Sequence, residues 1–135
     1  MTSIIVDAGP LIALFRRRDA HHARVKAFLA RNRARLVTTL PVVTEVCHFL
    51  NPKGKVSFLA WIRRSGLLVH AIETDHLDRI SSIIERYADQ NIDFADASLI
   101  WLADPLNTHR VMTIDRADFS VFRATNGTAF ELVLE

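Results

Sequence analysis

Two apolar segments of this chain each end in an aspartate. Residues 4–6, Ile-Ile-Val, lead into Asp7, and residues 111–114, Val-Met-Thr-Ile, lead into Asp115. Both segments have the composition of buried strands. Because the carboxyl ends of parallel strands line the ligand crevice of an open sheet, we expect the two carboxylates to meet there. Crowded carboxylates repel one another, and a divalent metal ion is the usual compensation.

Two further acids lie in segments predicted to be helical and largely apolar. At helical spacing, Glu45 shares one face with Val42, Val46 and Phe49. A carboxylate on such a face is costly unless it is paired or binds a metal. A partner arginine, or a helix that lets Glu45 reach outward, is the alternative explanation.

The other helical acid, Asp96, follows Asp93 by three residues. Asp93 is predicted to be the N-cap of a helix, and Asp96 then falls in the first turn, where the helix dipole stabilises acids. This explains Asp93 better than Asp96, whose neighbours are almost all apolar. We therefore favour Asp96 as the site residue and keep Asp93 as a secondary candidate.

Simpler explanations exist for some of these acids. Asp7 could cap a helix opened by Pro10, with Gly9 allowing a sharp turn. Asp118 could be a further ligand, although capping a short helical turn is the favoured explanation. Thr113 is predicted to point to the same side as Asp115, where its hydroxyl could bond a carboxylate or a water.

Oxygen-only ligands predict a hard cation, Mg²⁺ or Mn²⁺, with one or two ions bound. The six histidines lack the spacing of a zinc site, which disfavours zinc. The single cysteine, Cys47, is interpreted as a small buried hydrophobe.

Strand and helix patterns alternate along the chain. Strands are predicted at 3–6, 36–38, 67–72, 110–114 and 130–134, the last at a sheet edge. Helices are predicted from Pro10 and at 20–34, 41–50, 55–64, 74–88 and 94–103, with Asn51-Pro52 ending the third, Gly66 ending the fourth and Thr74 capping the fifth. Strands separated by helices imply a three-layer α/β/α domain around a mainly parallel sheet of about five strands.

Size and composition fit this fold. The 135 residues suit a single domain, 1–135, and an apolar fraction of 50% with a mean hydropathy of +0.15 excludes intrinsic disorder. No uncharged apolar run is long enough for a membrane helix, and no signal peptide is visible. One cysteine allows no internal disulfide, which predicts a cytoplasmic protein.

The basic residues are mostly arginine, and some are clustered. Only Lys26, Lys53 and Lys55 among the 17 basic residues are lysine, and the arginines gather at 16–18, 31–35 and 63–64. Arginine matches phosphate geometry, so the clusters could hold a nucleic-acid backbone. A solvated helix surface is an equally good explanation for any one cluster.

Four motifs, in this order, resemble those of the PIN-domain family and its VapC-like toxins of toxin–antitoxin pairs. They are Ile-Val-Asp7-Ala-Gly-Pro-Leu, Thr44-Glu45-Val46, Asp93-Phe-Ala-Asp96-Ala-Ser-Leu and Thr113-Ile-Asp115-Arg-Ala-Asp118-Phe. The resemblance covers essentially the whole chain. It implies a Mg²⁺- or Mn²⁺-dependent endoribonuclease that cuts RNA and forms a homodimer. It also implies a small antitoxin whose C-terminal tail reaches the active site.

Carried over from the family, the metal-site positions fall on Asp7, Glu45, Asp96 and Asp115. Thr113 would orient a carboxylate or the attacking water, and Arg116 would hold a flanking phosphate of the RNA. Many relatives have Ser, Thr or Asn directly after the first aspartate, whereas this chain has Ala8-Gly9. A polar helper is therefore missing, or the backbone supplies it.

Two other functions are compatible with acids at strand ends. A phospho-acceptor signalling domain needs a paired acid near the first strand and a lysine after a late strand, and this chain has no lysine beyond Lys55. A non-catalytic binding module would use the acids structurally. The position of the four acids in the fold decides between these alternatives.

Overall fold

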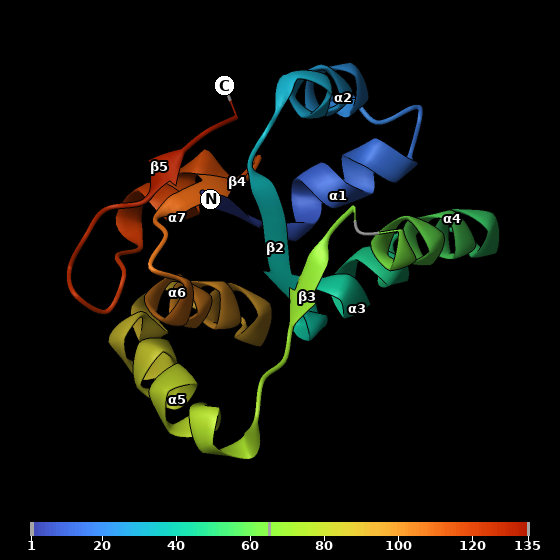
Figure 1. The fold of residues 1–135 in the computed structure, drawn as a ribbon. Helices are drawn as coiled ribbons and strands as arrows, with labels where there is room; N and C mark the ends of the chain where they lie inside the picture. Colours follow the sequence, from blue (N-terminus) through green and yellow to red (C-terminus); the bar gives the residue numbers. More distant parts are fainter. Residues whose placement is uncertain (1, 65, 135) are drawn as a thin grey trace.

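A parallel sheet forms the centre of the molecule (Figure 1), seen in a computed structural model that describes residues 2–64 and 66–134. Within these residues the sheet has five strands in the order β3-β2-β1-β4-β5, and every neighbouring pair is parallel. The strands are β1 (Ser3–Val6), β2 (Arg35–Thr39), β3 (Leu68–His70), β4 (Arg110–Met112) and β5 (Glu131–Leu132). The predicted sheet and its C-terminal edge strand are thus confirmed.

Helices cover both faces of the sheet. They are α1 (Ala8–Phe15), α2 (His22–Arg31), α3 (Leu40–His48), α4 (Pro52–Arg63), α5 (Leu77–Arg86), α6 (Phe94–Leu106) and α7 (Arg116–Val121), with short 3₁₀ helices η1 (Thr74–His76) and η2 (Ala88–Gln90). The group α1 to α4 lies on one side of the sheet and α5 and α6 on the other (Figure 1), which confirms the three-layer α/β/α fold. None of the helices in the described part of the chain combines the length and apolarity needed to cross a membrane.

The core is built around β1 and α6. Ile4, Ile5 and Val6 are fully buried because β1 pairs with β2 on one side and with β4 on the other. Every residue from 97 to 103 of α6 is buried. α6 lies against the sheet at β1 and β2 and is also covered by α5 and α3, so it is apolar on more than one face, which explains the weak helical periodicity of this segment.

Helix starts differ from the sequence expectations at two prolines. Gly9 and Pro10 do not form a turn, because α1 already begins at Ala8 and Pro10 falls in its first turn, where its missing N–H costs nothing. Asn51 and Pro52 do not merely end the preceding helix. The Asn51 side chain accepts a hydrogen bond from the Gly54 N–H at 2.8 Å and caps α4.

The predicted helix over 74–88 is divided into three pieces. Glu73, rather than Thr74, is the cap, because Glu73 and His76 exchange reciprocal side-chain-to-backbone hydrogen bonds that close η1. The segment then continues as α5, and Tyr87 ends that helix. Other boundaries differ by a few residues: β3 and β4 are shorter than predicted, α2 is shorter, and α6 continues to Leu106.

The helix face that carries Glu45 is less apolar than its spacing suggests. Phe49 follows the last residue of α3 and is 52% exposed, so it does not continue the buried stripe of Val42 and Val46. Cys47 is half-buried against the core rather than fully buried. Glu45 therefore lies where α3 leaves the core.

Buried hydroxyls connect the sheet to its neighbours. Thr38 donates to the Val6 carbonyl at 2.8 Å. Ser98 donates to the Ala95 carbonyl, so Thr39 must be the donor in its 2.7 Å bond to Ser98. This last bond joins the end of β2 to the first turns of α6 and fixes where Asp96 lies.

Candidate active site

Six carboxylates line one open cleft at the C-terminal edge of the sheet. They belong to Asp7, Glu45, Asp93, Asp96, Asp115 and Asp118. The cleft has a volume of about 410 Å³, and we call it the acidic cleft. Asp7 directly follows β1, Asp115 lies three residues after β4, and α3 and α6, which pack against each other, bring Glu45 and Asp96. All four acids predicted as metal ligands thus meet at one edge, together with both secondary candidates.

Asp7 is held by three hydrogen bonds. Its backbone N–H donates to the Met112 carbonyl at 3.0 Å, which extends the β1–β4 pairing to the edge of the cleft. One carboxylate oxygen accepts from the Ala8 N–H and the other from the Thr113 hydroxyl, each at 2.8 Å. The Ala8 amide thus gives Asp7 a backbone donor in a chain that has no polar side chain directly after this aspartate.

Thr113 connects the two strand-end acids. Its buried hydroxyl donates to Asp7 and accepts from the Asp115 N–H at 3.0 Å. The predicted hydrogen bond from Thr113 to a carboxylate is therefore present, with Asp7 as the partner. Because the hydroxyl has one proton, the two bonds fix its orientation.

Asp115 and Asp93 are both helix caps. The Asp115 carboxylate accepts from the Asp118 N–H at 3.2 Å at the start of α7, so Asp118 is not the cap that its position before Phe119 suggested. The Asp93 carboxylate accepts from the Asp96 N–H at 2.8 Å at the start of α6. Each cap has one carboxylate oxygen engaged by a backbone N–H, and both side chains still line the cleft.

The Asp96 carboxyl lies in an unfavourable place for a negative charge. Burial, followed by the negative charges of Asp7, Asp93, Glu45 and Asp118, raises its pKa to about 8. No backbone or side-chain donor to its carboxylate is present among the described residues. An acid in this environment is destabilising when charged, and a nearby cation would remove that cost.

The pKa values of three other acids are also raised. Burial raises the pKa of Asp7, and the nearby charges of Asp115 and Asp93 add to it, while the bonds from Thr113 and Ala8 oppose the rise. Burial and then the Asp93 and Asp7 charges raise the pKa of Glu45. The hydrogen bond shared with Asp115 is the main cause of the raised pKa of Asp118.

Among residues 2–64 and 66–134, no arginine or lysine forms an ion pair with a cleft carboxylate. Across the ranges that the structure describes, the ion pairs are Arg79–Asp104 and Arg110–Glu131, and neither contains a cleft carboxylate. The alternative of a partner arginine for Glu45 therefore does not hold for these residues. Uncompensated carboxylates that crowd together favour a divalent cation as the missing charge.

The residues fit a hard divalent cation in their chemistry. The donors are carboxylate oxygens, which Mg²⁺ and Mn²⁺ prefer, and Thr113 and backbone amides orient part of them. No three Asp, Glu, His or Cys side chains among residues 2–64 and 66–134 already stand close enough to form a ready-made ligand group. Cation binding therefore requires rotation of the carboxylates toward one another.

Two polar residues of the cleft were not anticipated. Gln90 and Asn91 line it from the turn before α6, and Asn91 has a positive φ of 53°. Asparagine is among the few residues that tolerate this backbone conformation, so Asn91 two residues before the cap was the available signal. Arg116, in contrast, does not line the cleft, and its guanidinium donates to the Leu134 carbonyl at 2.9 Å.

The fold and the cleft define a three-layer α/β/α domain with a carboxylate site at the C-terminal edge of a parallel sheet. The chain belongs to the PIN domain family, whose model matches residues 4–124.

Two Mycobacterium tuberculosis proteins are similar to this chain. Ribonuclease VapC26 is 25% identical over 134 residues, which cover 96% of this chain and 99% of the relative. The crystal structure of VapC20, described as a sarcin-ricin loop cleaving toxin, superposes with a TM-score of 0.74 at 21% identity. The superposition covers 84% of this chain and 90% of that one, and it confirms the fold.

Proposed function

We propose that this protein is a metal-dependent endoribonuclease and the toxin of a toxin–antitoxin pair. The observation that carries the proposal is the acidic cleft, in which carboxylates from β1, β4, α3 and α6 meet without a compensating cation from the described residues. Membership of the PIN domain family and similarity to a protein named ribonuclease VapC26 support the same activity. The substrate would be single-stranded or structured RNA.

In this proposal Asp7 and Asp96 are the main ligands of Mg²⁺ or Mn²⁺, and Glu45 and Asp115 complete the site. One or two bound ions would lower the pKa of a water and stabilise charge on the attacked phosphate. The reaction adds one water to a phosphodiester: the water oxygen bonds to phosphorus, and the bond from phosphorus to the leaving ribose oxygen breaks. That oxygen receives a proton.

The residues of this chain contribute position and charge. Thr113 holds the Asp7 carboxylate in one orientation, and the Thr39–Ser98 bond holds the first turns of α6 against β2. Asp93 and Asp118 add negative charge around the ligands, which strengthens cation binding. Asp96, whose pKa is raised by burial and the neighbouring acids, would hold the cation as a carboxylate, because metal ligands bind in their deprotonated form.

The test is cleavage of purified total RNA with Mg²⁺, with Mn²⁺ and with EDTA. We expect cleavage only with a divalent cation, and a loss of at least about 1000-fold in Asp7→Asn and Asp96→Asn, because the ligand set is broken. Asp104→Asn is the matched control, since Asp104 lies on the same helix and outside the cleft. Full activity in the Asp96→Asn protein would rule out this site.

The proposal extends to partners and to the place of action. The family resemblance and the toxin names of the relatives support a small cognate antitoxin, and the resemblance supports a homodimer. The single cysteine supports action in the cytoplasm. Co-expression with the reading frame directly upstream, followed by measurement of the mass of the complex, tests the first two: separate elution of the two proteins would contradict the pairing.

A further inference from the structure

A second concave surface lies where the end of α1 meets the starts of α2 and α4. Its volume is about 610 Å³, and an adjoining hollow of about 390 Å³ continues it, with Phe15, Arg17 and Asn51 shared between the two. We call the combined surface the basic groove. Nothing in the mechanism above uses it.

The charged residues of the basic groove are all cationic. Arg17, Lys26 and Lys53 line the larger part, and Arg16 and Arg18 line the adjoining part. Two of the three lysines of the whole chain thus lie in one groove. No carboxylate lines either hollow, and none of these five cations has an ion-pair partner among the described residues. All five side chains are exposed.

The acid that is closest in sequence to the arginine run makes a local hydrogen bond and does not line the groove. Asp19, in the turn between α1 and α2, accepts a hydrogen bond from the His21 N–H at 2.8 Å. His22, which lines the groove, donates from Nδ1 to the Ala13 carbonyl at 2.8 Å, because a carbonyl can only accept. This bond places a proton on Nδ1 of His22 and ties its ring to α1.

Aromatic and polar groups accompany the cations. Phe15 lines both parts of the groove, and Phe49, which lines the smaller part, is 52% exposed. The first turn of the 12-residue helix α4 contributes Lys53 and Gly54, and the positive end of its dipole adds to the field of the lysine. Phe15 is half-buried against Phe58 and Trp61, so Phe49 is the exposed ring of the two. Cations beside an exposed aromatic ring are the pattern of a surface that binds single-stranded nucleic acid.

Two helices connect the groove to the acidic cleft. α1 begins directly after Asp7 and ends at Phe15, a length of about 12 Å for its eight residues. α3 carries Glu45 in the cleft and is followed at its C-terminal end by Phe49 in the groove. A strand of a few nucleotides spans such a distance.

We propose that the basic groove binds the phosphate backbone of single-stranded RNA next to the phosphate that is cleaved. The inference rests on the proposed function, since it gives that substrate a second point of attachment. Arg17, Lys26 and Lys53 hold phosphates, and the exposed Phe49 contacts a base. An acidic protein segment is the competing ligand. RNA is favoured because the cations of the groove are exposed and spread along it, and because the groove offers no deep apolar pocket for a protein side chain.

The experiment measures binding without cleavage. A fluorescein-labelled single-stranded 12-nucleotide RNA of mixed sequence is titrated with the full chain in EDTA, and anisotropy gives the Kd between 50 and 200 mM NaCl. We expect the triple variant R17Q/K26Q/K53Q to bind at least tenfold more weakly. The slope of log K against log salt should fall by about 2, since each lost phosphate contact on a single strand contributes about 0.7.

The matched control removes the same charge elsewhere. Arg35, Arg63 and Arg64 are equally exposed and lie outside the groove, so R35Q/R63Q/R64Q should change the Kd less than threefold. Equal losses in the two triple variants, or no binding of the RNA by the wild-type chain, would overturn the proposal. The proposal would also be overturned if poly-L-glutamate bound more tightly than RNA and lost this binding in R17Q/K26Q/K53Q. The groove would then be a protein-binding site.

Cleavage assays separate this inference from the proposed function. If the chain cleaves RNA, the groove variant should raise KM for a 12-nucleotide substrate with kcat unchanged, because the acidic cleft is intact. If the groove variant cleaves RNA with unchanged Kd and KM, the RNA-binding role of the groove is wrong and the proposed nuclease function stands. RNA binding that depends on the groove, without cleavage in any metal, contradicts the proposed function alone.

Discussion

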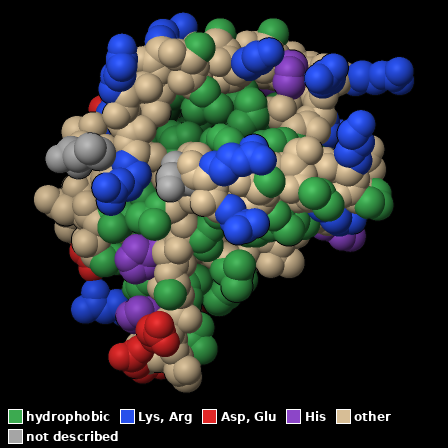
Figure 2. All heavy atoms as spheres, turned by 45° about the vertical axis from the view of Figure 1, so that its right-hand side comes forward, with side chains coloured by type: hydrophobic (Ala, Val, Ile, Leu, Met, Phe, Trp, Pro, Cys, Tyr) green, Lys and Arg blue, Asp and Glu red, His purple; other side chains and the backbone are tan. Residues whose placement is uncertain are grey.

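A hollow lies at each of the two edges of the sheet, and the two hollows differ in the residues that line them. At the C-terminal edge, like charges crowd into a half-buried cleft of about 410 Å³. At the N-terminal edge, the starts of β2 and β3 border a hollow of about 600 Å³ with mostly apolar walls. Figure 2 shows hydrophobic side chains gathered in a hollow of this face with Lys and Arg side chains around it. We call this region the apolar hollow.

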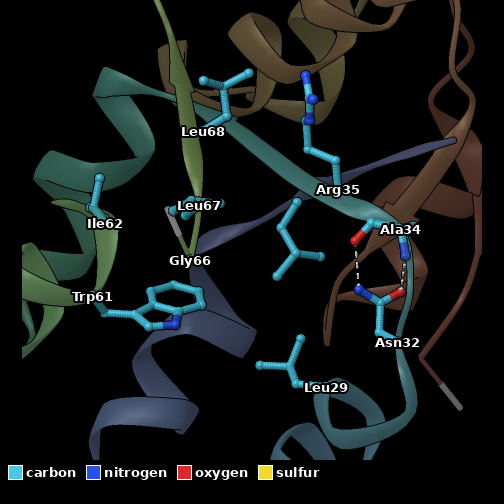
Figure 3. A pocket seen from close by; sticks show the side chains of 10 residues that line it. Leu29, Asn32, Ala34, Arg35, Trp61, Ile62, Gly66, Leu67 and Leu68 are labelled. Atoms are coloured by element: carbon cyan, nitrogen blue, oxygen red, sulfur yellow. Dashed lines mark hydrogen bonds between the residues drawn. The ribbon is translucent and has the colours of Figure 1, made fainter. Parts of the chain in front are cut away.

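The apolar hollow keeps its polar groups satisfied. Trp61, Ile62 and Leu67 lie on one side of it, and Leu29 lies near Asn32 on the other (Figure 3). The Asn32 amide donates to the Ala34 carbonyl at 2.8 Å and accepts from the Ala34 N–H at 3.1 Å. The arginines around the hollow are exposed, so water screens their mutual repulsion.

The contrast separates stability from function. The apolar hollow follows the rules of an ordinary protein surface, where buried polar atoms are paired and charges face water. The acidic cleft does not follow these rules, because its carboxylates are crowded, half-buried and lack basic partners among the described residues. A region that retains such a cost is the one in which chemistry is expected.

The largest expected effect is on a glycine of the apolar hollow. A Cβ on Gly66 would stand 2.2 Å from Nε1 of Trp61, so Gly66→Ala must displace the indole. We expect a loss of about 2–3 kcal/mol in the free energy of unfolding, measured in urea.

The same substitution at a glycine of the acidic cleft should instead increase the free energy of unfolding. In Gly9→Ala the new Cβ would make an ordinary 3.5 Å contact with Ile114, and helix propensity should add about 0.5–1 kcal/mol. Destabilisation by both substitutions would contradict this account of the two regions.

The second prediction concerns pH. The pKa of Asp96 is about 8 in the folded chain and near 3.8 when unfolded, so the folded state binds more protons between these values. Stability should therefore fall as pH rises from about 4 to 8 in EDTA. After allowance for solvent screening, Asp96→Asn should recover about 1–2 kcal/mol at pH 7.5 and flatten the profile. Asp104→Asn is the control and should leave the slope unchanged; a steeper slope in Asp96→Asn would show that Asp96 stabilises the fold.

The third prediction separates a buried hydroxyl of the cleft from one outside it. Thr113→Val removes the donor to Asp7 and the acceptor of the Asp115 N–H, and we expect a cost of about 1–2 kcal/mol with a fall of about tenfold or more in cleavage. Thr38→Val removes a comparable bond to the Val6 carbonyl and should cost similar stability while cleavage is unchanged. Equal cleavage in the two variants would remove Thr113 from the mechanism.

The smallest effect is expected at Arg116. Its guanidinium donates to the Leu134 carbonyl next to β5, so Arg116→Gln should cost about 0.5 kcal/mol by urea unfolding and leave KM for RNA unchanged. A threefold or larger rise in KM would instead support the role predicted from sequence, that Arg116 holds a phosphate.

Much of the acidic cleft could be predicted because its signals are local. Asp7 and Asp115 follow apolar strands, and Asp93 and Asp96 stand at a helix start, so parallel topology alone brings them to one edge. Gln90 and Asn91 were missed: the asparagine before the Asp93 cap indicated a turn, but the path of that turn to the cleft depends on how α5 packs against α6. The Ala8 amide was foreseen only as a possibility.

The predicted helix boundaries differ from the structure where a side chain caps the start of a helix. α3 ends before Asn51 and Pro52 as expected, but the next helix, predicted to begin at residue 55, already begins at Pro52 because Asn51 caps it. Glu73 and His76 close η1 with a reciprocal pair that a search for Ser or Thr caps overlooks. The apolar hollow had no sequence signal, since α2, β2, α4 and β3 contribute to it from separate parts of the chain.

The central position of β1 has a consequence for motion. Both of its edges are hydrogen-bonded, to β2 and to β4, whereas β5 has two residues and a single neighbour in the sheet. Amide hydrogen exchange should therefore be slowest along Ile4–Val6 and fast at the C-terminal strand. Fraying of that end would leave Asp7 anchored to the part of the molecule that opens only when the whole domain unfolds.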